Sequence, residues 1–424
     1  SGINARQESY IRNILNPDNE CLEINELKEP YFQLVTDKNI NSIFPRLKYN
    51  TETGFYDLDL LVKKEKDLEV DFGGNISSSP INEAFVGARY SIWGRNSLTM
   101  HGNFYFGKLY NSAHIAVRHN VPNKLPFFFE PYVTFNRFDY FKSSSAFLED
   151  IKPAYLITKD RIYGARMGIP ARNKGIVTFS GGAFKLTNQY YQGRDFSTQD
   201  TPDETTFEGG TVAMHFERNT LNRRMYADEG TFFSITSRFI SGRERTFPGS
   251  TAVVTDTISN DHTWLQMRLL YDNYFKSAGP FRFGFYTEMF LSAQPFFANY
   301  TSSILSSKGF EPIPQSQTLF LEDYHAHNYM GGGLKVITKV KGNIESRLEG
   351  YIFQPFQAIV QDNELKAEYG EAFSDRAYMA TLAAVYNSPF GPLSLSVNYY
   401  SKKEDPFTVL FHFGYIIFNR KALY

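Results

Sequence analysis

Residues 281–291 read Phe-Arg-Phe-Gly-Phe-Tyr-Thr-Glu-Met-Phe-Leu. Apolar side chains alternate with polar or small ones along this stretch, as they do on a β-strand whose two faces meet different surroundings. The same period of two returns around residues 265–275, 393–400 and 406–418. From Leu68 onward the sequence therefore predicts a succession of β-strands.

The composition of the two strand faces separates a soluble sandwich from a membrane barrel. The apolar face is rich in Phe, with Tyr near strand ends, which suits lipid and an aromatic girdle. The opposite face carries charged side chains such as Arg282 and Glu288, which are too polar for a sandwich core. A wide barrel with a wet lumen accommodates them. We expect the row Phe281, Phe283 and Phe285 to face lipid.

The overall composition agrees with a barrel. The chain has 424 residues, a formal net charge of −1 and a mean hydropathy of −0.37. A balanced charge gives no attraction to nucleic acid, so we expect no nucleic-acid partner. No run approaches the roughly 18 apolar residues of a spanning helix. Low mean hydropathy with 40 Phe and 28 Tyr is typical of barrels, because lipid-facing and lumen-facing residues cancel in the average.

The links between strands predict their number. Short links at 276–280, 341–343 and 388–392 alternate with long ones at 242–262, 294–328 and 361–370, apart from a short link at 401–405. Short periplasmic turns and longer outer loops give this alternation. Residues 219–229 are then periplasmic and follow an even number of strands. We mark nine candidates before them, one of which, within 127–170, must be wrong; eight strands there and eight afterwards predict an antiparallel transmembrane barrel of about sixteen strands.

The first 67 residues have a different pattern. Ala5–Leu15 and Ile24–Val35 are predicted helices, and residues 44–49 and 56–62 are predicted strands around a turn at 51–54. The sequence thus divides into a small α+β region, 1–67, and a barrel, 68–424.

Two turns resemble those of a known superfamily. Residues 219–230 resemble the turn before a strand in the POTRA-plus-barrel superfamily of BamA, TamA and the two-partner secretion transporters, and residues 388–396 resemble the turn into its penultimate strand. Region 1–67 is similar to a POTRA domain, a β-α-α-β-β unit, without its first strand. The resemblance implies a Gram-negative outer-membrane barrel with a periplasmic POTRA.

A closer resemblance covers nearly the whole chain. Residues 27–32, 71–77, 312–320 and 347–355 resemble the barrel half of patatin-like phospholipases, which are akin to type Vd autotransporters. In such proteins a patatin lipase domain precedes the POTRA. The G-x-S-x-G elbow of a patatin is absent from these residues, so we expect no catalytic residue here, although the parent would be a lipid acyl hydrolase.

In that superfamily the long loop folds into the lumen and an Arg of an R-G-F/Y motif contacts the inner wall. The counterpart here, Gln294–Asn328, offers Lys308-Gly309-Phe310 or Tyr324-His325-Ala326 instead. Glu345, Arg347 and Glu349 share one strand face and could receive the loop, or could simply be lumen polarity. We hypothesise that Lys308 or His325 docks near Glu345 or Glu349.

Two further motifs carry weaker hypotheses. His325 and His327, with Glu322 and Asp323, could bind zinc, but a packed loop is the simpler interpretation, and we expect no metal or cofactor. The last predicted strand resembles the β-signal by which the barrel assembly machinery recognises its substrates. Its residues are Phe411, Phe413, Gly414, Tyr415, Ile417 and Phe418.

The sequence favours an outer-membrane translocator or membrane anchor for an N-terminal patatin-like phospholipase. Its expected partners are outer-membrane lipids, the assembly machinery during biogenesis, and a fused or cleaved patatin passenger. One alternative is a BamA- or TamA-like assembly factor, and another is a passive porin-type channel.

Overall fold

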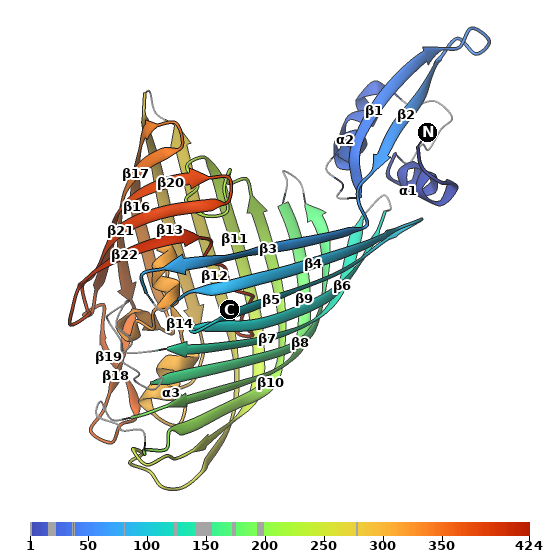
Figure 1. Cartoon of the computed structure of the whole chain (residues 1–424). Coiled ribbons are helices and arrows are strands. Elements are labelled where there is room, and N and C mark those ends of the chain that lie inside the picture. The colour runs from blue at the N-terminus through green and yellow to red at the C-terminus, as the bar shows by residue number, and fades with distance from the viewer. Residues whose placement is uncertain are drawn as a thin grey trace.

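The computed structural model describes residues 2–15, 23–35, 37, 39–79, 81–122, 126–140, 155–171, 175–192, 199–276 and 279–424. Within this part of the chain, a small N-terminal unit lies beside one end of a large β-barrel (Figure 1). No helix among these residues has the length and apolar character needed to cross a bilayer.

The N-terminal unit contains two helices and a hairpin. The helices α1 (Ala5–Leu15) and α2 (Ile24–Val35) occupy the predicted residues, and β1 (Ile40–Tyr49) pairs antiparallel with β2 (Tyr56–Lys64). Helix α1 begins at Asn4, whose side chain accepts hydrogen bonds from the N–H groups of Arg6 and Gln7. Buried side chains from all four elements form one core: Tyr10, Ile11, Ile14, Leu34, Ile40, Ile43 and Val62.

This core continues into the barrel through Trp93. The Trp93 indole packs edge-on against Tyr10, with 5.8 Å between ring centroids, and is only 5% exposed. Gln7 donates to the Trp93 carbonyl oxygen at 3.3 Å, and Ser97 donates to the Asn39 side chain at 3.1 Å. These contacts seat the unit on the turn between the second and third barrel strands.

Sixteen antiparallel strands close the barrel, which confirms the predicted number. They are β3 (Leu68–Ser77), β4 (Glu83–Trp93), β5 (Ser97–Gly107), β6 (Tyr110–Val121), β7 (Phe127–Tyr140), β8 (Leu156–Ala171), β9 (Gly175–Tyr190), β10 (Asp203–Asn219), β11 (Gly230–Phe247), β12 (Ile258–Lys276), β13 (Phe281–Ser292), β16 (Tyr329–Lys341), β17 (Ile344–Pro355), β20 (Ala377–Ser388), β21 (Gly391–Tyr400) and β22 (Phe407–Gly414). Eight of them precede residue 220, and the described residues of 127–170 contain β7 and most of β8.

The side chains of the barrel strands lie on the two faces that the alternation predicted, mainly apolar ones outside and mainly polar ones inside. Phe281, Phe283 and Phe285 are 44%, 36% and 41% exposed on the outside. Glu288, on the opposite face of the same strand, is 1% exposed and accepts hydrogen bonds from Arg268, Tyr286 and Tyr329. An apolar outer surface around a polar, hydrogen-bonded interior is the arrangement of a barrel immersed in lipid.

The two ends of the barrel differ in their links. We call the end where β3 begins, next to the N-terminal unit, the proximal end, and the other the distal end. The long links 293–328 and 356–376 are distal; the latter contains a small hairpin of β18 (Gln357–Gln361) and β19 (Ala367–Ala372). Strands β11 and β12 extend further than predicted, so the link between them is 248–257 rather than 242–262. The longest proximal link, 220–229, turns into the lumen.

Candidate functional site in the barrel lumen

The long loop between β13 and β16 lies inside the barrel. It contains α3 (Tyr300–Ser306), β14 (Lys308–Gly309), the 3₁₀ turns Pro314–Thr318 and Glu322–Tyr324, and β15 (His325–Ala326). Phe310 is 1% exposed and packs among lumen-facing rings, with centroid distances of 6.0 Å to Tyr329 and 5.6 Å to Phe353. A Cβ on Gly331 would come within 2.1 Å of the Phe310 ring, so this glycine makes room for the loop.

The predicted docking residues of the loop have local partners. Lys308 donates to the carbonyl oxygen of Gly309 and lies 3.6 Å from the Glu311 carboxylate. The ring of His325 contacts the Ser307 carbonyl oxygen at 3.1 Å. Among the described residues neither side chain has a hydrogen bond or ion pair with Glu345 or Glu349, so the hypothesis that Lys308 or His325 docks there needs correction.

The wall of Glu345, Arg347 and Glu349 receives a different segment. Arg347 is 2% exposed and donates to Glu345 and Glu349, each over 2.9 Å. Its third nitrogen, Nη2, donates to the Ala227 carbonyl oxygen of the 220–229 link at 3.0 Å. The proximal link therefore occupies the wall. The arginine of the network is Arg347, which belongs to the wall itself and not to the long loop.

Tyr226 connects this link to the long loop. Its backbone has φ 56°, and its hydroxyl donates to Ser394 on β21 at 3.1 Å and accepts from the Gln315 amide of the loop at 2.8 Å. The Arg347 guanidinium lies 5.6 Å from the Tyr226 ring. The long loop thus reaches Arg347 through Tyr226 rather than through a basic residue of its own.

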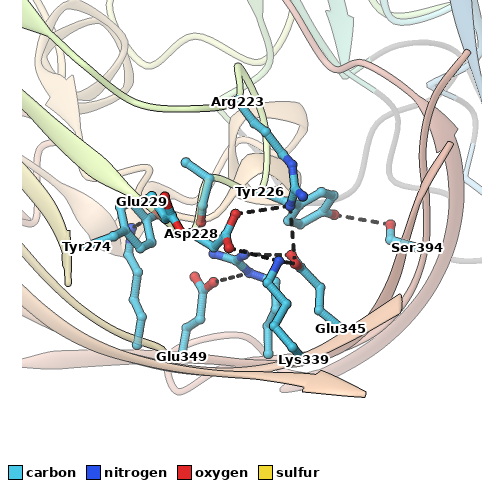
Figure 2. A network of polar contacts seen from close by, with 12 residues as sticks. Arg223, Tyr226, Asp228, Glu229, Tyr274, Lys339, Glu345, Glu349 and Ser394 are labelled. Carbon is cyan, nitrogen blue, oxygen red and sulfur yellow. Dashed lines mark hydrogen bonds and ion pairs between the residues drawn. The ribbon is translucent and has the colours of Figure 1, made fainter. Parts of the chain in front are cut away.

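Asp228 and Arg223 complete the network, which Figure 2 shows from close by. Lys339 lies 2.8 Å from Asp228 and 2.6 Å from Glu345, and Arg223 lies within 3.2 Å of both carboxylates. Burial favours a higher pKa for Asp228, but hydrogen bonds from Asn222 and Lys339 and the charge of Arg223 hold that pKa below its usual value. The link is therefore held in the lumen by alternating charges.

His325 and His327 do not converge. His327 contacts the Tyr369 hydroxyl at 2.9 Å, whereas His325 contacts Ser307. The described residues contain no group of three His, Cys, Asp or Glu side chains placed to share an ion.

The last strand is shorter than predicted. It ends at Gly414 with φ +106°, where a Cβ would come within 2.2 Å of the Gly74 carbonyl oxygen. The prediction that this strand continues through Tyr415, Ile417 and Phe418 is therefore wrong. The chain turns inward instead, and Phe418 packs in the lumen against Tyr110 at a centroid distance of 4.7 Å. We call residues 415–424 the tail.

The closing seam of the barrel is short. Strand β22 pairs with β3 through only three residue pairs, His412–Ser77, Phe413–Ile76 and Gly414–Asn75. Three hydrogen bonds between Phe411 and the residues Ser77 and Ser78 supplement them. Every other neighbouring pair of barrel strands has a longer register, and Leu68–Gly74 of β3 have no strand partner on the β22 side within the described residues.

Sequence reasoning did not anticipate two parts of this site. Tyr226, Asp228 and Arg223 lie in a segment that the sequence identified only as a turn, from the link lengths and by resemblance. Its ten residues, 220–229, make it unusually long for a proximal turn, which was an available signal. The glycine run 331–333 within a predicted strand was a second available signal, since interior glycines mark close approach.

These features define a transmembrane β-barrel whose lumen is occupied by its own loop, link and tail. The chain resembles BamA from Haemophilus ducreyi lacking POTRA domains 1-3, with a TM-score of 0.60 and 12% identity, covering 96% of this chain and 81% of that one. It also resembles CdiB from Acinetobacter baumannii, with a TM-score of 0.52 and 10% identity, covering 98% and 72%. No protein-family model and no curated protein matches the sequence. At these identities the likeness shows the fold alone, a closed β-barrel like those of the BamA and CdiB structures.

Proposed function

We propose that this chain is an outer-membrane barrel that translocates or anchors a polypeptide passenger. The observation that carries the proposal is the occupied lumen. The loop, link and tail are held by side-chain contacts such as Arg347 to Ala227, which can be released without breaking the strand ladder. A passive channel would need an open bore, which this arrangement disfavours.

The N-terminal unit supports the same proposal. Its two helices over a hairpin match the later part of the β-α-α-β-β order of a POTRA domain. Docked at the proximal end through Trp93, it would stand in the periplasm at the mouth of the barrel. A patatin-type lipase as passenger rests on the sequence resemblance alone. A G-x-S-x-G motif encoded upstream of Ser1 would support it, and further POTRA repeats there would count against it.

The short seam favours a second candidate, an assembly factor that accepts strands of other barrels. Three residue pairs close the seam, and the unpartnered edge of β3 could receive an incoming strand by β-augmentation. The two functions differ in route, since a translocator uses the lumen and an assembly factor uses the seam. In either case β22 would guide insertion of this barrel by the assembly machinery.

A disulfide across the seam separates the two routes. Ile76 and Phe413 are register partners, and such partners have Cβ atoms about 4.5–5.5 Å apart, close to disulfide range. We expect Ile76→Cys with Phe413→Cys, in a Cys21→Ser background, to leave passenger delivery intact when oxidised. Loss of delivery that reductant restores would favour the assembly factor. The single variant Phe413→Cys is the control.

Conductance in planar bilayers tests the porin alternative. We expect the intact barrel to be nearly silent, and a variant lacking residues 300–324 to conduct more, because that segment occupies the part of the lumen that the link and the tail leave free. A large, steady conductance that is the same in both proteins would overturn the proposed function.

A further inference from the structure

The last six residues cross the lumen from one side of the barrel to the other. Asn419 contacts side chains of β5 and β6, through Asn103 and Ser112 at 2.8 Å each. Leu423 and Tyr424 lie against β12, β13 and the long loop. The chain ends within the barrel (Figure 1). Residues 419–424 therefore lie across seven or more strands of the wall without pairing in any ladder.

Side chains of the wall bind the backbone of this segment. Tyr110 accepts a hydrogen bond from the Asn419 N–H at 2.8 Å, and Asn136 donates to the Arg420 carbonyl oxygen at 3.0 Å. At Ala422 the N–H donates to Asp160 and the carbonyl oxygen accepts from Arg238, both at 2.7 Å. Gln266 donates to the Leu423 carbonyl oxygen. We call Tyr110, Asn136, Asp160, Arg238 and Gln266 the lumen track.

Contacts with the main chain depend little on the side chains of the bound segment. The side chains of the segment add contacts at several points. The Asn419 amide donates to Asn103 and Ser112, and the Lys421 ammonium lies 4.5 Å from the centre of the Phe138 ring. The apolar contact is made by Ala422 and Leu423, which are 1% and 2% exposed in a cluster with Phe207, Ile240 and Trp264. The track thus has the features of a site for an extended polypeptide with a small apolar anchor.

Two charged residues of the lumen track, Asp160 and Arg238, have polar atoms that make no hydrogen bond among the described residues. Asp160 is 2% exposed, and neither it nor Arg238 forms an ion pair within the described residues. Asp160 Oδ1 and Arg238 Nε are buried and make no hydrogen bond there. Both residues bond to the Ala422 backbone, and each keeps one buried polar atom without a hydrogen bond. Such atoms are unfavourable in a closed interior, so their place beside the bound backbone points to a ligand-binding role.

We propose that the lumen track is a binding site for an extended polypeptide and that residues 419–424 are its resident, displaceable occupant. The biological meaning rests on the proposed polypeptide-handling function, because a passenger entering the lumen would take over the backbone hydrogen bonds that the tail now makes.

Peptide binding in trans tests the proposal. The probe is a fluorescent hexapeptide with the sequence of residues 419–424, added to the detergent-solubilised barrel and to a variant ending at Phe418. We expect binding at least about tenfold tighter to the shortened barrel, because the tail occupies the site at high effective concentration. Anisotropy measures the affinity, and heat-dependent gel mobility verifies folding.

Two changes address recognition of the main chain. The peptide carrying Ala422→Pro lacks the N–H that donates to Asp160, and Arg238→Ala removes the donor to the Ala422 carbonyl oxygen. Each should weaken binding about tenfold, as expected for a hydrogen bond to a charged group. Arg243→Ala is the matched control, because Arg243 lies on the same strand but is exposed and pairs with Asp261. It should change nothing.

A folded shortened barrel that does not bind the peptide, or that binds it equally well after both changes, would overturn the proposal. If the shortened barrel does not fold, full-length Ala422→Pro serves instead, since its loosened tail should admit the peptide more readily than the unchanged chain does; equal binding would overturn the proposal. These measurements do not involve passenger delivery, so a failure here is distinguishable from a failure of the proposed function.

Discussion

Arg347 on β17 donates a hydrogen bond to the carbonyl oxygen of Ala227, 120 residues earlier in the chain, over 3.0 Å. The same guanidinium bridges Glu345 and Glu349. One buried arginine thereby pairs with two wall carboxylates and bonds the proximal link inside the lumen, and Lys339 and Arg223 add positive charge at Glu345.

Replacing Arg347 should destabilise the barrel strongly. We expect Arg347→Met to lower the free energy of unfolding in urea by about 3–5 kcal/mol, because the buried Glu349 loses its ion-pair partner and Glu345 keeps only Lys339 and Arg223. Arg243→Met, at an exposed ion pair, should cost no more than about 1 kcal/mol. Equal losses in the two variants would show that lumen water screens the network.

Acidification should loosen the long loop. Burial lowers the pKa of His325 to about 4, and burial does the same for the pKa of His327. An unfolded histidine titrates near 6.5, so the unfolded loop binds more protons between about pH 6.5 and 4. The packed loop is then fully stable above this window and loses stability as the pH falls through it.

Limited proteolysis of the loop between pH 7.5 and 4.5 measures this effect. His325 faces Glu311, Lys308 and Lys421, and the pKa of Glu311 is kept low by Lys308 despite burial, so Glu311 stays charged. Burial raises the pKa of Asp323, which works in the opposite direction. The double variant His325→Gln with His327→Gln should remove the acid sensitivity; its persistence would assign it elsewhere.

Trp93 should control docking of the N-terminal unit. We expect Trp93→Ala to cost about 3–5 kcal/mol of local packing and to speed protease cleavage at the largely exposed junction 65–67, because an undocked unit lets this junction move, while the barrel stays closed. Trp264→Ala is the matched control, because the second tryptophan of the chain lies in the lumen cluster. Unchanged cleavage at 65–67 in both variants would mean that Gln7 and Ser97 suffice for docking.

A charge on the outer surface should be costly where it meets lipid. We expect Phe283→Arg to destabilise the barrel in lipid by about 2–4 kcal/mol if the residue lies near the bilayer midplane. Phe390→Arg, at a proximal turn where Phe390 is 86% exposed, should cost about 0–1 kcal/mol. Equal costs in unfolding titrations from liposomes would contradict the lipid-facing assignment of the Phe281–Phe285 row.

The alternation of short and long links in the sequence determined the strand number. The sequence also determined the two N-terminal helices and the outward-facing and inward-facing residues of strands such as 281–291. These follow from local periodicity, since a period of two places alternate residues such as Phe283 and Glu288 on opposite faces whatever their distant neighbours are. The resemblance to a POTRA-plus-barrel superfamily also predicted a barrel, and the BamA and CdiB structures have a similar fold.

Only the tertiary structure decided what fills the lumen. Any polar residue satisfies the alternation at a lumen-facing position, so the sequence could not pair Arg347 with Ala227 or Asp160 with Ala422. Such contacts join residues 120 and 262 positions apart and depend on barrel closure and strand stagger. The inward turn at Gly414 likewise depends on how close Gly74 of the first strand lies, a distance that no local pattern records.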